Sequence, residues 1–282
     1  MKKGLILEGG AMRGMFTCGV IDVFLENNIE FDGMVGVSAG ATFGCNFVSK
    51  QHGRALRYNK LYSHDKRYAS LSSLVKTGDY YGAEFCYEIL PQKLDVFDYE
   101  ALKNNPMEFW VTATDLDTGR AVYHKFTDAG PVDMKWMRAS ASMPLFSSIV
   151  EIGDRKLLDG GIADSIPLKF FEHRGYEKNV VVATQPTSYI KKKNSAMAVI
   201  KAVYRKYPAM IQAMATRHLR YNRETDYIKA RAAVGKAFLI APEEPLNISH
   251  TEKNPAELER VYEIGRKVAE KRLEAMKKYL EA

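Results

Sequence analysis

A serine between two glycines is the residue of this chain whose type and setting best suit covalent chemistry. The motif G-V-S-A-G at residues 36–40 places Ser38 between Gly36 and Gly40. Apolar residues before the motif predict a strand and the residues after it predict a helix, which is the strand–turn–helix setting of a nucleophile elbow. Such a turn holds the serine hydroxyl clear of the backbone, and the glycines let neighbouring elements approach closely. An ordinary turn can have the same residues, so the motif needs partners elsewhere in the chain.

A glycine-rich loop lies between a strand expected over residues 3–8 and a helix expected over residues 12–27. Its backbone N–H groups and the helix N-terminus together favour an anion. Two anions suit such a loop, the pyrophosphate of a dinucleotide and the oxyanion of an acyl-transfer intermediate, and simple close packing of helix on strand is a third explanation. The glycine spacing departs from G-x-G-x-x-G, which favours the oxyanion. The residues concerned are Gly9, Gly10, Ala11, Arg13 and Gly14.

A carboxylate that could serve the serine as a base stands at Asp159. It follows an apolar run that predicts a strand, and Gly160 and Gly161 come directly after it. As a lone dipeptide Asp-Gly is an ordinary turn signal. A partly desolvated carboxylate within hydrogen-bond reach of a serine can nevertheless take its proton directly. The fold would have to bring Asp159 to Ser38.

In this order the three motifs resemble the signatures of the bacterial patatin-like phospholipases: a glycine-rich oxyanion loop with a basic residue, a nucleophile elbow and the sequence Asp-Gly-Gly. The resemblance covers roughly residues 3–185, and two weaker stretches, 139–144 and 164–167, agree with it. Two residues depart from the family pattern. Ala11 stands where many members have a third glycine, and Ser165 stands where asparagine is common.

The resemblance implies a three-layer α/β/α sandwich with a mostly parallel central sheet. It also implies a serine acyl hydrolase that cleaves fatty acyl esters of phospholipids or lysophospholipids through a Ser-Asp dyad and an acyl-enzyme, with no metal or organic cofactor. In that scheme Ser38 is the nucleophile and Asp159 the base, and Arg13 orders the loop or meets the lipid phosphate. The implied oxyanion donors and supporting glycines are Gly9, Gly10, Ala11, Gly14, Gly36, Gly40, Gly160 and Gly161.

Two features of the sequence bear on the dyad. Only one strand is expected before the strand that leads into Ser38, whereas the elbow of an α/β-hydrolase follows several. His173, His218 and His250 follow Asp159 and have the order that a triad would need, but each stands in a polar setting typical of the surface. Two other functions stay open at this stage, a noncatalytic lipid-binding protein and a dinucleotide-binding oxidoreductase.

Composition indicates one soluble α/β domain, because 46% of the 282 residues are hydrophobic and 27% are charged. The three cysteines are widely spaced, which argues against a disulfide framework or a zinc site and favours a reducing, cytoplasmic location. The first apolar run is too short for a signal peptide, and none of the runs is long enough to span a membrane. The segment 68–87 is interpreted as a connection whose tyrosines lie on the surface.

Residues 1–185 are predicted to form the catalytic core, and residues 186–282 to add a strand and helices on the same domain. The C-terminal helix is expected over residues 255–281, with Asn254 as its N-cap. The segment 188–223 contains nine of the 41 Lys and Arg residues and none of the 34 Asp and Glu residues. It suits peripheral contact with an anionic membrane, a cap over an acyl site or a packed helical face. No nucleic acid is expected, and the oligomeric state is left open.

Overall fold

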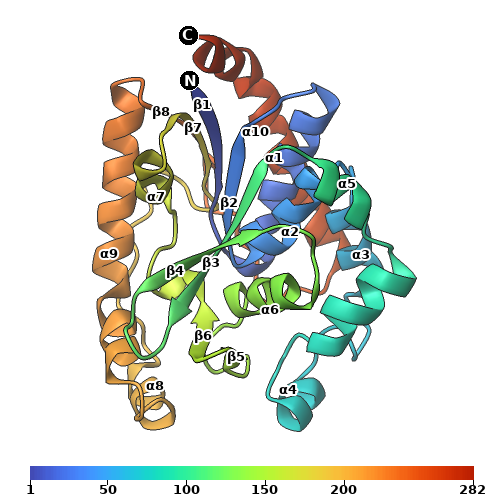
Figure 1. The fold of residues 1–282 in the computed structure, drawn as a ribbon, viewed down its shortest axis with the longest axis vertical. Helices are drawn as coiled ribbons and strands as arrows, with labels where there is room; N and C mark the ends of the chain where they lie inside the picture. Colours follow the sequence, from blue (N-terminus) through green and yellow to red (C-terminus); the bar gives the residue numbers. More distant parts are fainter.

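The computed structural model describes residues 1–282 and places an eight-stranded sheet between two layers of helices (Figure 1). The strand order is β5-β6-β3-β2-β1-β7-β8, and β4 pairs with β3 outside this path. The five strands from β3 to β8 along this order are parallel, and β4, β5 and β6 are antiparallel to their neighbours. The strands are β1 (Lys2–Leu7), β2 (Gly33–Val37), β3 (Glu108–Asp115), β4 (Ala121–Phe126), β5 (Val150–Ile152), β6 (Arg155–Asp159), β7 (Tyr176–Val182) and β8 (Ala237–Ile240).

The sheet is buried on both faces, as the near-continuous apolar runs of its strands predict. Side chains of β1 alternate between two hydrophobic clusters: Leu5 and Leu7 belong to the larger one, and Ile6 belongs to the other. The larger cluster is built with α1 (Gly14–Glu26), α2 (Ala39–Val48), α3 (Arg54–Tyr62) and α10 (Pro255–Glu281), and the smaller one with α7 (Leu168–His173) and α9 (Pro208–Ala233). The predicted three-layer α/β/α sandwich is therefore confirmed.

The remaining helices are short and lie mostly around the carboxyl ends of the strands (Figure 1). They are the helices η1 (Ala11–Arg13), α4 (Leu71–Thr77), η2 (Phe85–Leu94), α5 (Tyr99–Asn104), α6 (Pro131–Ser140), η3 (Gly160–Ile162) and α8 (Met197–Val203). None of the helices combines the length and the hydropathy of a membrane span.

The interpretation of residues 68–87 as a connection with surface tyrosines is wrong. The segment contains α4, and Tyr68 and Tyr80 are buried. Tyr68 donates its hydroxyl proton to Asn59 at 2.6 Å and packs edge-on against Phe85. A tyrosine can place its ring in the core when its hydroxyl finds a partner, which local composition does not reveal.

The C-terminal third of the chain continues the same sheet and the same helical layers. The last strand, β8, pairs in parallel with β7 in register from Asn179 opposite Ala237. The helix α10 packs on α1, and its N-cap, Asn254, accepts a hydrogen bond from the N–H of Ala256 at 3.0 Å, as predicted.

Candidate active site

Ser38 stands at a sharp turn between β2 and α2. Its backbone has φ 54° and ψ −123°, a conformation that a residue with a side chain rarely adopts. A Cβ atom on Gly36 would lie 2.6 Å from the Ala41 nitrogen, and one on Gly40 would lie 2.7 Å from the Glu8 carbonyl oxygen. Only glycine fits at either position, so the spacing of the motif follows from the turn.

The elbow is fixed by a residue that sequence reasoning did not single out. The backbone N–H of Ser38 donates to Oγ of Ser140 at 2.9 Å, and this hydrogen bond is buried. Ser140 ends α6, far from the elbow in the sequence. The only sequence signal for Ser140 was the weak family resemblance of residues 139–144. The role of a positioning serine depends on which backbone group it contacts, and the sequence does not show this.

Replacing Ser140 by alanine is expected to destabilise the fold by about 1–3 kcal/mol, since a buried N–H loses its acceptor. Urea denaturation of the variant and the wild type measures the difference. The matched control is Ser147→Ala, because Ser147 is half-buried nearby and its hydroxyl makes no hydrogen bond to protein. Equal stability of the Ser140→Ala variant and the wild type would contradict this role.

Asp159 is brought to the elbow by strand register. Val37, the last residue of β2, lies opposite Thr112 of β3, and the next residue of β3, Ala113, lies opposite Asp159 at the end of β6. The strand β3 therefore carries the ends of β2 and β6 on its two sides. This long-range pairing places the Ser38 side chain next to the Asp159 carboxylate, where its interaction lowers the pKa of the carboxyl group.

The Asp159 carboxylate is buried and held in place. Its Oδ1 accepts the N–H of Gly161 at 2.8 Å, and its backbone N–H donates to the Ser142 carbonyl at 2.8 Å. Burial raises the pKa of Asp159, and Ser38, the Arg217 guanidinium and the Gly161 N–H each lower it, without reversing the net rise. A carboxylate with a raised pKa beside a serine hydroxyl is suited to accept its proton.

The glycine-rich loop lies directly against the elbow. A Cβ atom on Gly9 would lie 2.9 Å from the Cβ of Ser38. The N–H groups of Gly9 and Gly10 make no hydrogen bond within the protein. Ala11 has φ 48°, a left-handed conformation, which explains why glycine suits this position. The loop thus presents two unpaired N–H donors next to Ser38, the geometry that binds an oxyanion.

Glu8 supports the glycine-rich loop through Thr184, a role that the sequence did not indicate. It is buried; its Oε2 accepts the N–H of Thr184 at 2.5 Å, and its Oε1 accepts the hydroxyl of Tyr221 at 2.7 Å. Thr184 also donates its hydroxyl proton to the Gly9 carbonyl at 3.1 Å. A glutamate at the end of an apolar strand gives no sign in the sequence of which partners satisfy it.

An apolar cavity opens beside Ser38, on the α2 and α3 side of the sheet. Of its 21 lining residues, 17 are hydrophobic. Many of them come from α2, α3, η2 and α6 and from the segment 68–87. Besides Ser38 it is lined by Ala11, Met12, Ala39, Thr42, Phe43, Cys45, Arg54, Tyr58, Tyr68, Tyr81, Cys86, Tyr87, Leu90, Pro91, Phe97, Phe126, Met134, Met137, Ala141 and Met143.

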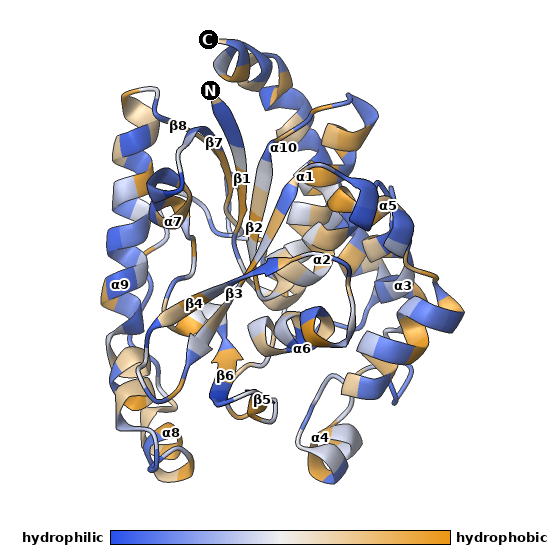
Figure 2. Cartoon of the chain, in the orientation of Figure 1, coloured by the Kyte–Doolittle hydropathy of each residue, from blue (hydrophilic) through white to orange (hydrophobic).

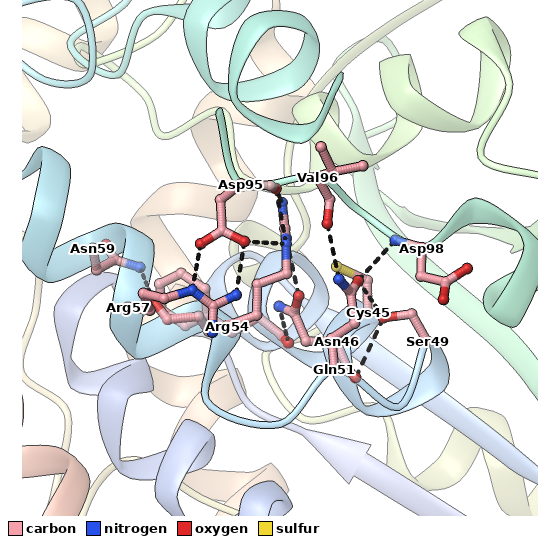
Figure 3. A network of polar contacts seen from close by, with 12 residues as sticks. Cys45, Asn46, Ser49, Gln51, Arg54, Arg57, Asn59, Asp95, Val96 and Asp98 are labelled. Atoms are coloured by element: carbon pink, nitrogen blue, oxygen red, sulfur yellow. Dashed lines mark hydrogen bonds and ion pairs between the residues drawn. The ribbon is translucent and has the colours of Figure 1, made fainter. Parts of the chain in front are cut away.

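The far wall of this cavity is held by an arginine and aspartate network (Figure 3). Arg54 is buried, donates to the Asn46 side chain at 3.0 Å and pairs with Asp95 at 3.3 Å. Arg57 pairs with the same carboxylate at 2.7 Å. Asp95 is the C-cap of η2, so the network fastens η2 to α2 and α3.

None of the three histidines that follow Asp159 hydrogen-bonds to Ser38 or Asp159. His173 is exposed at the end of α7, and His218 lies on α9. His250 accepts a hydrogen bond from Arg13, whose Nη1 lies 2.7 Å from its Nε2. Arg13 itself lies over the loop, with Nε 3.3 Å from a Cβ position on Gly10.

Comparisons with known proteins agree with this architecture. The family of patatin-like phospholipases matches residues 5–171, and a domain of unknown function, DUF6363, matches residues 207–281. The uncharacterised protein YjjU of Escherichia coli is 30% identical over 187 residues, which cover 65% of this chain and 52% of that protein. An NTE family protein of Mycobacterium bovis is 28% identical over 164 residues, 58% of this chain and 44% of that protein. The lysophospholipase nte1 of Aspergillus niger is 29% identical over 180 residues, 61% of this chain and 11% of that protein. The chain spans about half the length of the first two relatives.

Proposed function

The chain belongs to the patatin-like phospholipase family, and from this premise we propose that it is a serine hydrolase that cleaves fatty acyl esters of phospholipids or lysophospholipids. The observation that carries the proposal is the position of Ser38, whose side chain lies beside the Asp159 carboxylate and lines an apolar cavity. A nucleophile, a base and a site for an acyl chain meet at one point.

In the proposed reaction, Oγ of Ser38 attacks the ester carbonyl carbon while Asp159 accepts its proton. The carbonyl oxygen becomes an oxyanion and is bound by the N–H groups of Gly9, Gly10 and Ala11. The ester C–O bond then breaks, and the alcohol leaves with the proton from Asp159. Water, deprotonated by Asp159, attacks the acyl-enzyme, and the fatty acid is released as Ser38 is regenerated.

The apolar cavity supports a long acyl chain as the group transferred. Burial of each methylene contributes about 0.8 kcal/mol, so a fatty acyl chain binds an apolar wall far better than a short acyl group does. Ser38 and Ala39 line the cavity, and so an acyl chain that occupies it can have its carbonyl end at the serine.

The rate should depend on pH through Asp159. The base must be ionised, so activity is present above its pKa and is lost as the pH falls through it. Burial raises this pKa above its ordinary value, so the acid limb of kcat/KM is expected above the value of about 3.9 for a free aspartate. Hydrolysis of a soluble p-nitrophenyl ester between pH 3 and pH 8 measures the limb. An acid limb at or below pH 3.9 would contradict the assignment.

Covalent labelling tests the proposal directly. A fluorophosphonate probe is expected to attach to Ser38 in the native protein, as read by mass spectrometry of the peptide that contains it, and long-chain lysophospholipid is expected to be hydrolysed. Unfolded protein is the control, because the hydroxyl is activated only by the folded site. A native protein that binds lipid but is not labelled at Ser38 would instead be a noncatalytic lipid-binding protein.

We further propose that the helix α8 contacts an anionic membrane. Val199 and Val203 are exposed on it, and Lys201, Arg205 and Lys206 lie on or just after it. Figure 2 shows hydrophobic residues on α8 and on α4, which lie at the same end of the molecule in Figure 1.

Val203→Asp is expected to weaken binding to phosphatidylglycerol vesicles several-fold, because it places a negative charge on this surface. Vesicle sedimentation measures binding, and Val234→Asp is the control, since Val234 is also exposed and lies at the far end of α9. Equal loss in both variants would contradict a role of α8.

A further inference from the structure

Three cations converge on the side of the candidate site that faces α9. Arg13 lies over the glycine-rich loop. Arg217, on α9, donates from Nε to the Gly161 carbonyl at 2.5 Å, two residues beyond Asp159. Lys191 lies on the loop before α8, with its Nζ 4.6 Å from the ring centroid of Tyr221, which is one turn after Arg217 on α9.

The backbone of Lys191 is held in place by two hydrogen bonds to the side chain of Asn222. Its N–H donates to Oδ1 of Asn222 at 2.8 Å, and its carbonyl accepts from Nδ2 of Asn222 at 3.2 Å. Tyr221, beneath the ammonium group, is tied by its hydroxyl to Glu8 at 2.7 Å. Lys191 and the oxyanion loop are therefore joined through one short series of contacts.

None of these three cations forms an ion pair with a carboxylate. Two half-buried arginines elsewhere in the protein do have one: Arg138 pairs with Asp79 at 2.9 Å, and Arg266 pairs with Glu26 at 2.8 Å. Three carboxyl groups lie near them, and each accepts other hydrogen bonds: Glu8 from Thr184 and Tyr221, Asp159 from the N–H of Gly161, and Glu224 from the N–H of Ser165. Like charges gathered without a direct ion pair repel one another, an arrangement that a bound anion would stabilise.

The neighbouring titratable groups respond to this positive field. Desolvation, Arg217 and Arg13 lower the pKa of Lys191 to about 8, against an opposing effect of Glu8 and Glu224. Desolvation, followed by Arg13, Lys191 and Arg217, lowers the pKa of His250 to about 4. His250 is therefore neutral at pH 7, and it accepts a hydrogen bond from Arg13 rather than adding a further charge.

Arg217 and the apolar cavity lie on opposite faces of the sheet. The cavity is built on the α2 and α3 side of the sheet, whereas Arg217 comes from α9, which covers the other side (Figure 1). An ester bound at Ser38 with its acyl chain in the cavity directs its alcohol part away from the cavity. That part would enter the positive field.

We propose that Arg13, Lys191 and Arg217 form a subsite for the phosphate group of the substrate's head group. The proposal rests on the proposed function for the direction of the substrate, and its chemistry is that of a phosphate ester held by cations. Lys191 and Arg217 lie outside residues 5–171, and Arg217 and His250 lie within the domain of unknown function. The C-terminal part of the chain would thus supply head-group recognition to the catalytic core.

Binding to the Ser38→Ala variant tests the subsite without turnover. In isothermal titration calorimetry we expect sn-glycerol 3-phosphate to bind and glycerol not to bind. Adding Lys191→Met should weaken glycerol 3-phosphate about tenfold, the effect of one charge-assisted contact. Lys191→Arg keeps the positive charge and should retain binding. It therefore distinguishes loss of the charge from a folding defect at this position. The control is Lys236→Met, because Lys236 is exposed at the amino end of β8, whereas the candidate site lies at the carboxyl ends of the strands.

The outcomes separate the possible sources of the phosphate. Tighter binding of inorganic phosphate than of glycerol 3-phosphate would overturn the head-group assignment in favour of a free phosphate site. No binding of either, or equal weakening by Lys191→Met and Lys236→Met, would overturn the subsite.

Turnover separates the subsite from the proposed function. For an active enzyme, the ratio of kcat/KM for a lysophosphatidylglycerol to that for a monoacylglycerol of the same chain should fall about tenfold with Lys191→Met. An unchanged ratio would overturn the subsite while leaving the hydrolase intact. Glycerol 3-phosphate binding by a protein that hydrolyses no ester would leave the phosphate subsite supported and overturn the hydrolase alone.

Discussion

Ser38→Ala is expected to reduce kcat for acyl ester hydrolysis by about 10⁶-fold, as loss of the nucleophile does in a serine protease. The remaining N–H donors of the loop and the apolar cavity still bind substrate, so KM should change little. The variant should keep its fold, because Ser38 already adopts a positive φ and alanine at this position adds no further backbone strain. Continuous assay with a p-nitrophenyl ester measures the loss, and circular dichroism verifies the fold.

The matched control for this variant is Ser165→Ala. Ser165 is buried and also near the site, but its hydroxyl donates to the Gly161 carbonyl at 2.9 Å and does not line the cavity. Its loss should cost less than tenfold in kcat. Retention of most activity in Ser38→Ala would contradict the nucleophile assignment, whatever the control shows.

Asp159→Asn is expected to lower kcat by about 10³–10⁴-fold. The amide has the shape of the carboxylate, and its oxygen can still accept the N–H of Gly161. It cannot accept the Ser38 proton at neutral pH, so both acylation and labelling by a fluorophosphonate should slow. The control is Asp164→Asn, a half-buried aspartate on the same stretch that accepts a hydrogen bond from Tyr123 at 2.5 Å.

The same variant should be at least as stable as the wild type at pH 7. The pKa of Asp159 is raised in the folded state, so above that pKa the ionised carboxylate disfavours folding. Asparagine removes this charge, and the difference disappears as the pH falls through the raised pKa. Thermal unfolding at pH 7 measures it. Lower stability together with full activity would mean that Asp159 serves the fold and not the reaction.

A mechanism with a catalytic histidine predicts a different effect of His250→Ala from the one that the Ser-Asp dyad predicts. If His250 were the base, His250→Ala would lower kcat as far as Ser38→Ala does. The structure instead pairs His250 with Arg13, and so its loss should act on the loop and on head-group binding. Sequence order alone kept all three histidines open, because a triad is recognised by geometry.

The basic segment 188–223 shows what a charge pattern can predict and what it cannot. Its composition predicted a membrane surface, a cap or a packed face without deciding between them. The structure divides it: Tyr221 packs against the sheet, Lys191 and Arg217 turn toward the site, and Lys201 is exposed on α8. Net charge does not tell which side chains face inward, because that depends on how the loop before α8 meets α9.

The sequence by itself determined the fold class and the family of this protein. The glycines around Ser38, the glycine-rich loop and the apolar runs before Ser38 and Asp159 are local features. They sufficed to predict the sharp turn at Ser38, the sheet and the family, and the proposed oxyanion loop rests on them. Only the tertiary structure decided which of these segments lie next to one another and which distant residues support them. Strand β3 joins Ser38 to Asp159 by register, and Ser140, Glu8 and Tyr68 acquire their roles from partners distant in the chain. Such contacts depend on long-range packing, which residue patterns within one segment cannot encode.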